Sequence, residues 1–389
     1  MTASILGLGT AVPTVRLTQD EIRDFFAAQP GLDRRARRLL HAAFDAAAID
    51  TRHTVLSELG PHGGGLHVRD GDLLLSPSTG ARNDEFVRSA PPLFAAAARD
   101  ALAAAGVGAD EVTHVVTVSC TGLIAPGPDY RLVRDLGLDP TVERDHLGFV
   151  GCAAAVPALR QAARIVAADP DAVVLVAAAE LCSLHIRGSD DPEQIVAASV
   201  FADGAAAAVV SGDPLRGLGR RLELSGFATR LSDEGATDMT WTVGDDGFEM
   251  TLTAEVPRIV GREVRAVVDD VYGGAEGVDA WAVHPGGRSI LDRVEGGLDL
   301  PDDALGASRD VLRRFGNMSS ATLLFILRDI LADPARPDGQ TLGALAFGPG
   351  LTVEAARMVL RDRAAAPGGL SSDAEGSATA DRRPTLVER

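Results

Sequence analysis

Residues 172–179 read Ala-Val-Val-Leu-Val-Ala-Ala-Ala, an unbroken apolar run that leads into Glu180-Leu181-Cys182. Such a run, rich in β-branched residues and without a polar position, is typical of a strand buried on both faces. Comparable runs occur at 113–119, 204–211, 280–284 and 342–347, separated by Ala-rich or amphipathic segments such as 91–105, 155–168 and 255–272. This alternation predicts an α/β fold with parallel strands, preceded by a helix-rich opening at 19–48.

Four of the predicted strands end in unusual loops, which are Ser119-Cys120-Thr121-Gly122, Glu180-Leu181-Cys182, His284-Pro285-Gly286-Gly287 and Phe347-Gly348-Pro349-Gly350. Ligands collect at the carboxyl ends of strands in open α/β sheets, so these loops predict one shared site. Two loops lie on each side of a Gly- and Arg-rich joint at 212–222, as a duplicated α/β half would place them. With 389 residues, we expect two halves, 1–215 and 216–362, and a disordered tail, 363–389.

Composition excludes several classes of function. The formal charge of −18 disfavours nucleic acid as a partner, because phosphate binding requires clustered basic residues, and any anionic substrate must meet a local basic patch. No apolar run is long enough to span a bilayer, and the first residues lack the basic segment of a signal peptide, so we expect a cytoplasmic protein without membrane contact. Three widely spaced cysteines indicate neither disulfides nor a metal site.

Cys152 is the first candidate for chemistry. It follows Gly148-Phe149-Val150-Gly151 and precedes an Ala-rich helical stretch, which places the thiol near a helix N-terminus. The helix dipole favours the thiolate there and can lower the thiol pKa below about 8.5. The alternative is that Cys152 is a small buried hydrophobe, and the glycines before it make the two interpretations equally plausible.

His284 and Asn317 are the other two candidates. His284 ends a predicted strand and is followed by Pro285-Gly286-Gly287, so its imidazole is presented at a loop, although a structural histidine is the commoner case. Asn317 precedes an apolar helical run, where it is either a helix N-cap or a neutral donor to a developing oxyanion. Together with Cys152 these residues form the Cys-His-Asn set of acyl chemistry.

Five blocks, in order, resemble the type III polyketide synthases, also called the chalcone and stilbene synthase family, within the thiolase-like superfamily. The blocks are Gly151-Cys152, Val200-Phe201-Ala202-Asp203-Gly204, His284-Pro285-Gly286-Gly287, Gly316-Asn317-Met318-Ser319-Ser320 and Phe347-Gly348-Pro349-Gly350. The resemblance extends from about residue 5 to residue 360. It implies an αβαβα layered fold of two duplicated halves, and an acyltransferase in which Cys152, His284 and Asn317 are catalytic.

The resemblance also assigns the residues of the substrate pocket. Its gatekeeping phenylalanines fall on Phe201 and, less securely, Met250, and the cyclisation pocket on Cys120, Cys182, His185, Ser319 and Phe347. Ala125 takes the place of a methionine that, in relatives, enters the neighbouring subunit's cavity, and the Ala125-Pro126 bond is a candidate cis peptide. The two pocket cysteines resemble bacterial enzymes and favour a long or flexible acyl starter.

The implied reaction is iterative decarboxylative condensation of malonyl-CoA onto an acyl-CoA starter held on Cys152, followed by cyclisation to a pyrone, resorcinol or related aromatic product. Coenzyme A thioesters are then substrates, no cofactor is required, Arg52 is the expected coenzyme A contact, and a homodimer is expected. The arginines at 34, 35, 37 and 38 are interpreted as a solvated helix face. Two alternatives remain: a ketoacyl synthase that extends on acyl carrier protein, and a non-catalytic scaffold.

Overall fold

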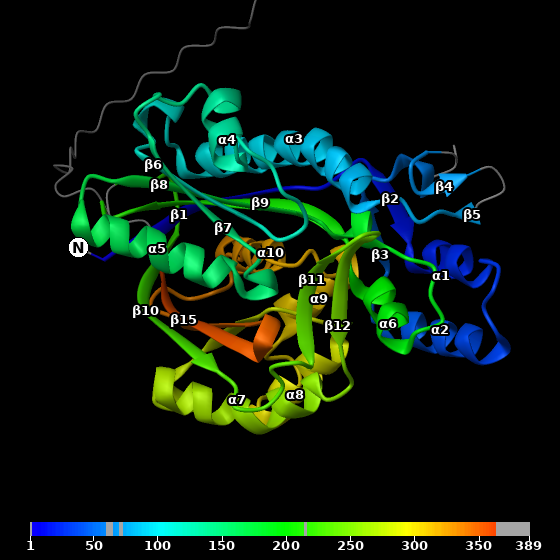
Figure 1. The fold of residues 1–389 in the computed structure, drawn as a ribbon. Coiled ribbons are helices and arrows are strands. Elements are labelled where there is room, and N and C mark those ends of the chain that lie inside the picture. The colour runs from blue at the N-terminus through cyan, green and yellow to red at the C-terminus, as the bar shows by residue number, and fades with distance from the viewer. Residues whose placement is uncertain (1, 60–64, 70–72, 214–215, 363–389) are drawn as a thin grey trace, which may run out of the picture.

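A nine-stranded mixed sheet organises the molecule (Figure 1). The computed structural model describes residues 2–59, 65–69, 73–213 and 216–362. The strand order is β13-β14-β15-β10-β1-β9-β8-β6-β7. The bounds of these strands are β1 Ser4–Ala11, β6 His114–Ser119, β7 Glu143–Gly148, β8 Val173–Leu181, β9 Asp203–Ser211, β10 Arg221–Leu231, β13 Ala280–Val283, β14 Thr341–Gly348 and β15 Thr352–Arg361.

The sheet is parallel only toward its two ends, so the prediction of parallel strands is confirmed there and wrong for the strands between them. The pairs β6–β7, β6–β8 and β13–β14 are parallel, whereas β8–β9, β9–β1, β1–β10, β10–β15 and β15–β14 are antiparallel. The tight turn at Pro349–Leu351 gives one reason, because it joins β14 directly to β15 and so short a connection can form only an antiparallel pair.

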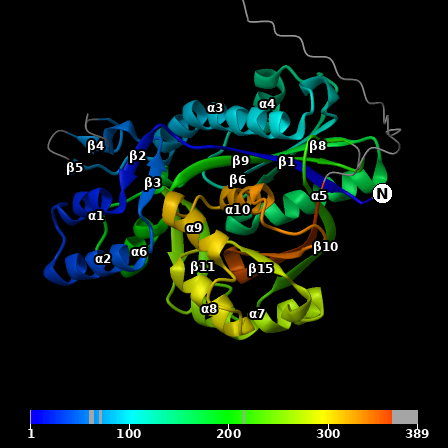
Figure 2. The ribbon, with the colours of Figure 1, turned by 180° about the vertical axis from the view of Figure 1, so that it is seen from behind.

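The chain forms five layers, as both ribbon views show (Figures 1 and 2). Helices α3 (Thr79–Ala105) and α4 (Pro128–Leu136) cover one outer face, and α7 (Val256–Tyr272) and α8 (Arg288–Leu298) cover the other. Between the two parts of the sheet lie α5 (Ala155–Ala168) and α10 (Ala321–Ala332), whose buried residues share one core with strands from both halves. Because α10 is enclosed by strands and other helices, it is apolar over almost all of its surface.

The remaining elements lie at one end of these layers. Helices α1 (Gln19–Ala27) and α2 (Arg34–Ala46) form the predicted helical opening and pack near α6 (Pro192–Val200) (Figure 1). The hairpin of β11 (Met239–Gly244) and β12 (Gly247–Leu252) follows β10 and lies beside α6. The other elements are β2 Val15–Thr18, β3 Thr51–Thr54, β4 Val68–Arg69, β5 Leu73–Leu74 and α9 Gly306–Phe315.

The five predicted strands are confirmed to within two residues at each end, and the predicted helix at 155–168 matches α5. Helix α3 begins earlier than the predicted segment at 91, because Ser78 caps it and Pro91 and Pro92 are accommodated inside it. The boundary at 215/216 stays a prediction, and the tail at 363–389 lies outside the described residues. Within the described ranges, no helix combines the length and apolar character needed to cross a bilayer.

Candidate active site

A cavity of about 650 Å³ contains all three residues of the predicted Cys-His-Asn set. Phe201 and Phe347 also line it. Cys152, His284 and Asn317 come together here although Cys152 and Asn317 are 165 residues apart in the chain. We call this space the outer cavity. Its walls come from α2, α6, β12, α7 and α8.

Cys152 lies in a 3-10 turn, Gly151–Ala153, directly before α5, as the sequence predicted. Gly151 has φ +72°, and a Cβ there would lie 2.3 Å from the Pro349 ring, so only glycine fits this approach to the thiol. The burial of the thiol, however, raises its pKa to about 11, against the expected lowering. Hydrogen bonds from Ser319 and Asn317 favour the thiolate and oppose part of this effect.

His284 follows β13 directly and is 1% exposed. Its backbone is fixed by a 2.8 Å hydrogen bond to the Leu345 carbonyl, but neither ring nitrogen has a hydrogen-bond partner among the described residues. Burial lowers the pKa of His284 to about 3, so the free imidazole is neutral. Because buried polar atoms are nearly always paired, two unpaired nitrogens facing a cavity indicate that a ligand supplies the missing partner.

Asn317 lies in the loop between α9 and α10, and its backbone joins the two halves of the chain. Its N–H donates to the Val200 carbonyl, and its own carbonyl accepts from Ala202 N–H, both at 2.8 Å. Its side-chain Oδ1 accepts from Ser319 N–H at 2.8 Å, whereas Nδ2 makes a long 3.3 Å contact with the Gly286 carbonyl and also lowers the pKa of the Cys152 thiol. The N-cap of α10 is Ser320, so the N-cap interpretation of Asn317 was wrong and its amide donor is available to the cavity.

Transfer of a proton from Cys152 to His284 would avoid the cost of forming either charge alone. A buried thiolate alone or a buried imidazolium alone is costly, because each isolated charge loses its hydration. Moving the Cys152 proton to His284 forms both charges at once and leaves the net charge of the cavity unchanged. Hydrogen bonds from Ser319 and Asn317 then act on the thiolate side of this pair. The arrangement suits nucleophilic acyl transfer.

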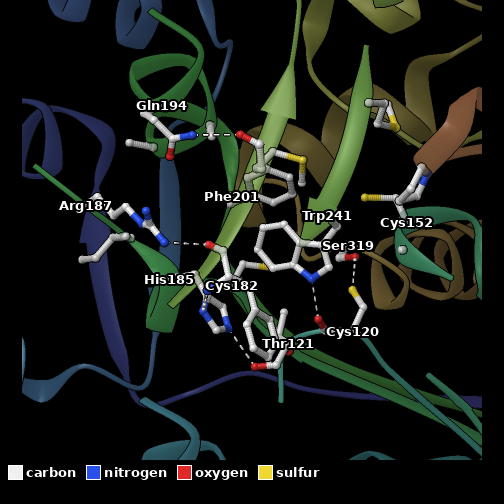
Figure 3. A pocket seen from close by; sticks show the side chains of 18 residues that line it. Cys120, Thr121, Cys152, Cys182, His185, Arg187, Gln194, Phe201, Trp241 and Ser319 are labelled. Carbon is white, nitrogen blue, oxygen red and sulfur yellow. Dashed lines mark hydrogen bonds between the residues drawn. The ribbon is translucent and has the colours of Figure 1, made fainter. Parts of the chain in front are cut away.

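A second, smaller cavity of about 60 Å³ begins on the other side of Cys152. Four residues line both cavities, namely Cys152, Phe201, Met239 and Met250. The inner cavity is further lined by the predicted pocket residues Cys120, Cys182, His185 and Ser319 (Figure 3). The structure therefore places Phe201 and Met250 at the boundary between the outer and the inner cavity.

Comparisons with known proteins identify the family. Models of the N-terminal and C-terminal domains of chalcone and stilbene synthases match residues 1–214 and 227–362. The chain belongs to the chalcone and stilbene synthase family. Bisdemethoxycurcumin synthase from Oryza sativa subsp. japonica is 33% identical over 91% of both chains. Probable polyketide synthase 1 from Dictyostelium discoideum is 30% identical over 90% of this chain, which spans only 11% of that protein.

Solved structures agree with this assignment to the chalcone and stilbene synthases. The type III polyketide synthase domain of Steely1 from Dictyostelium has a TM-score of 0.85 at 29% identity, over 92% of this chain and 99% of that one. PKS-I from the brown alga Ectocarpus siliculosus has a TM-score of 0.83 at 28% identity, over 93% and 98%. The chain is thus a type III polyketide synthase with a thiolase-like fold, and an acyltransferase by class.

Aromatic packing fixes the predicted pocket residue His185. His185 stacks on Phe248 with ring centroids 4.2 Å apart, and both of its nitrogens are engaged, with Thr121 O at 2.8 Å and Phe248 N–H at 3.0 Å. Burial lowers the pKa of His185 to about 3. This histidine is therefore a fixed, neutral wall of the inner cavity and has no ring nitrogen left for proton transfer.

Trp241 is a site residue that sequence reasoning missed. Its indole lies among the other lining side chains (Figure 3), packs edge-on against His185 and Phe248, and donates from Nε1 to the Cys120 carbonyl at 2.6 Å. It comes from β11, a strand that was not predicted. Two features of the sequence could have indicated it. The chain has two tryptophans, and this one alternates with threonines at 239–243.

The Glu180 side chain is hydrogen-bonded to residues that line the inner cavity. This fully buried carboxylate accepts hydrogen bonds from Cys120 N–H at 3.0 Å, Thr121 Oγ1 at 2.9 Å and Ser320 Oγ. Burial raises its own pKa, and burial followed by its negative charge raises the pKa of Cys120 and Cys182 well above the ordinary thiol value. Cys120 and Cys182 are therefore neutral wall residues, and Cys152 is the thiol best placed for nucleophilic attack.

Arg52, the expected coenzyme A contact, does not line either cavity. Arg52 is 5% exposed and donates to the carbonyls of Ala198 and Phe201 at 2.7 and 2.8 Å, so its position does not support the coenzyme A contact predicted for it. Its Cγ would clash with a Cβ at Gly316, which has φ +73°, so the stem of Arg52 packs against the loop before Asn317 while the guanidinium bonds to the end of α6 and to Phe201. Ala125 is exposed, its place at a neighbouring subunit's cavity stays a prediction, and its bond to Pro126 is cis, as predicted.

Proposed function

We propose that the chain condenses malonyl-CoA with an acyl-CoA starter by way of a thioester on Cys152, and that Cys152, His284 and Asn317 carry the reaction. The observation behind this proposal is that these three side chains line one cavity, with unpaired imidazole nitrogens and a weakly engaged amide donor facing it. In the first step, His284 accepts the Cys152 proton, the thiolate attacks the starter carbonyl, and the thiol of coenzyme A leaves with that proton.

The second half of the cycle makes the carbon–carbon bond. Malonyl-CoA in the outer cavity loses carbon dioxide, and the enolate oxygen left behind accepts hydrogen bonds from His284 and from Asn317 Nδ2. The enolate carbon attacks the thioester carbonyl on Cys152, which restores the thiolate and releases a β-ketoacyl-CoA. Repetition lengthens the chain, and folding of that chain in the inner cavity allows cyclisation.

The size of the inner cavity supports a short starter. About 60 Å³ remains beyond Cys152, since Trp241, Phe248 and His185 occupy the space around it. A long acyl chain has no room there without movement of the β11–β12 hairpin. We therefore propose a small acyl starter and few extensions, in place of the long or flexible starter that the cysteine pattern favoured.

The test is product analysis with graded acyl-CoA starters and malonyl-CoA, without any carrier protein, using Cys152→Ala as the control. The proposal predicts products by mass spectrometry from short starters, none from Cys152→Ala, and a decline as the acyl chain lengthens. Extension that occurs only on acyl carrier protein would instead indicate a ketoacyl synthase. No turnover with thioesters of coenzyme A or of acyl carrier protein would favour a scaffold. A homodimer and a cytoplasmic location are part of this proposal, and light scattering tests the dimer.

A further inference from the structure

Arginines gather at the mouth of the outer cavity, in a chain whose formal charge is −18. Arg258 from α7 and Arg288 and Arg293 from α8 line that mouth, and all three are exposed. Arg258 and Arg293 also line an open groove of about 580 Å³ between the two helices, together with Arg262. The shared residues make the groove continuous with the route to Cys152.

Three glycines and four charged side chains line this α7–α8 groove. A Cβ at Gly296 would meet no atom within 4 Å, whereas one at Gly297 would lie 2.9 Å from the Gly261 carbonyl oxygen, so the two helices pack closely beneath the groove. Asp292 lies on the rim and, with Glu193 of the outer cavity, partly offsets the four arginines. Among the residues that line the two spaces, these four arginines therefore outnumber the two carboxylates, whereas Glu255 and Glu234 lie outside the lining and pair with Arg258 and Arg262.

The arginines differ in how far carboxylates already engage them. Arg258 pairs with Glu255, Arg262 with Glu234 at 2.5 Å, and Arg288 with Asp292 at 3.5 Å. Arg293 has no carboxylate within ion-pair distance among the described residues and packs its stem over Gly261. All of these pairs are exposed and therefore weak, so a phosphate with two or three charges can compete for the guanidinium groups.

The opposite wall of the outer cavity offers no such groups. Helix α2 contributes Ala43, Ala46 and Ala47, and α6 contributes Pro192, Glu193, Val196 and Ser199. Among the described lining residues, every side chain that is cationic at neutral pH comes from α7 or α8. The arginines of α2, at 34, 35, 37 and 38, line neither space.

We propose that the nucleotide end of the coenzyme A thioester lies in the α7–α8 groove, with its phosphates on Arg258, Arg262 and Arg293, while the acyl end reaches Cys152 through the outer cavity. This inference rests on the proposed function and gives the substrate's phosphates the place that Arg52 cannot supply. Guanidinium groups bind phosphate through paired N–H donors, which fixes the orientation of the nucleotide as well as its affinity.

The test compares Arg258→Ala/Arg293→Ala with a matched control, Arg35→Ala/Arg38→Ala, which removes two exposed arginines from α2. Steady-state decarboxylation is measured with malonyl-CoA and with malonyl-pantetheine, which lacks the nucleotide. We expect the α7–α8 variant to raise KM for malonyl-CoA by about 10- to 100-fold, with a much smaller change for malonyl-pantetheine and in kcat. The increase should shrink as salt is added, because exposed charges are screened.

Three results would overturn the assignment: an unchanged KM for malonyl-CoA in the α7–α8 variant, equal losses with both substrates, or the larger loss in the α2 control. A defect confined to thioesters of acyl carrier protein would also overturn it, by showing that the arginines receive an acidic protein surface. Failure of the proposed function is separate, because it would abolish wild-type turnover of malonyl-CoA and malonyl-pantetheine alike.

Discussion

Asn317→Asp separates the chemical role of Asn317 from its structural one. The aspartate keeps the volume of the side chain and an oxygen that can accept the 2.8 Å hydrogen bond from Ser319 N–H, so the turn before α10 is retained. It loses the Nδ2 donor, which makes a long 3.3 Å contact with the Gly286 carbonyl and favours the Cys152 thiolate. The enolate formed by decarboxylation would then face a carboxylate where it needs a donor.

The expected loss follows from the value of one donor to a developing oxyanion. Removal of such a donor costs about 3–4 kcal/mol, so malonyl-CoA decarboxylation should slow by on the order of 10²–10³-fold. Conversion to acetyl-CoA is followed by chromatography, and thermal unfolding checks that the variant is folded. The chain's other asparagine provides the control: Asn83 also donates once and accepts once, both with Leu123, away from the two cavities, and Asn83→Asp should retain the normal rate. Decarboxylation by Asn317→Asp at the wild-type rate would refute the donor role.

Three further changes test other parts of the site. Trp241→Ala should enlarge the inner cavity by on the order of 100 Å³ and shift the products toward longer chains, and an unchanged product profile would show that Trp241 does not limit length. Asp203 is fully buried and burial raises its pKa from 3.8 to about 6, so its contribution to the free energy of unfolding is present below about pH 3.8 and falls by about 3 kcal/mol as pH rises through 6. Chemical denaturation of Asp203→Asn across pH 4–7 should lack that decline; a pH dependence equal to the wild type would contradict the assignment. Arg52→Ala should lower the melting temperature, since it leaves two buried carbonyls unpaired, without raising KM for malonyl-CoA, and a selective rise in KM would return Arg52 to the coenzyme A site.

The strands that could be predicted from sequence are those buried on both faces. Every residue of β8 and β9 is buried, and both are apolar except near their ends, so their pattern needs no information about neighbours. β10 mixes buried and exposed positions, and β15 carries Glu354 and Arg357 in its interior. Their place in the sheet depends on pairing with each other, which local composition does not encode.

The site residues also fall into those that local sequence predicts and those that depend on distant contacts. Cys152 and His284 were predictable because glycines and prolines mark the turns that present them at strand ends or before a helix. Arg52 was misplaced, because whether an arginine points outward or inward depends here on the Phe201 carbonyl, 149 residues away in the chain. Trp241 was missed for a related reason, since its role comes from packing against His185 and Phe248.

The partnership of Cys152 and His284 is tested most directly by the pH dependence of Cys152 alkylation in the wild type and in His284→Gln. Iodoacetamide labelling of the Cys152 peptide is measured by mass spectrometry from pH 5 to 10. In His284→Gln no base accepts the proton of the buried thiol, so labelling should be slow at pH 7 and rise about tenfold per pH unit up to pH 10. The wild type should react at least about tenfold faster at pH 7, because His284 accepts the proton. Superimposable profiles for the two proteins would contradict the partnership.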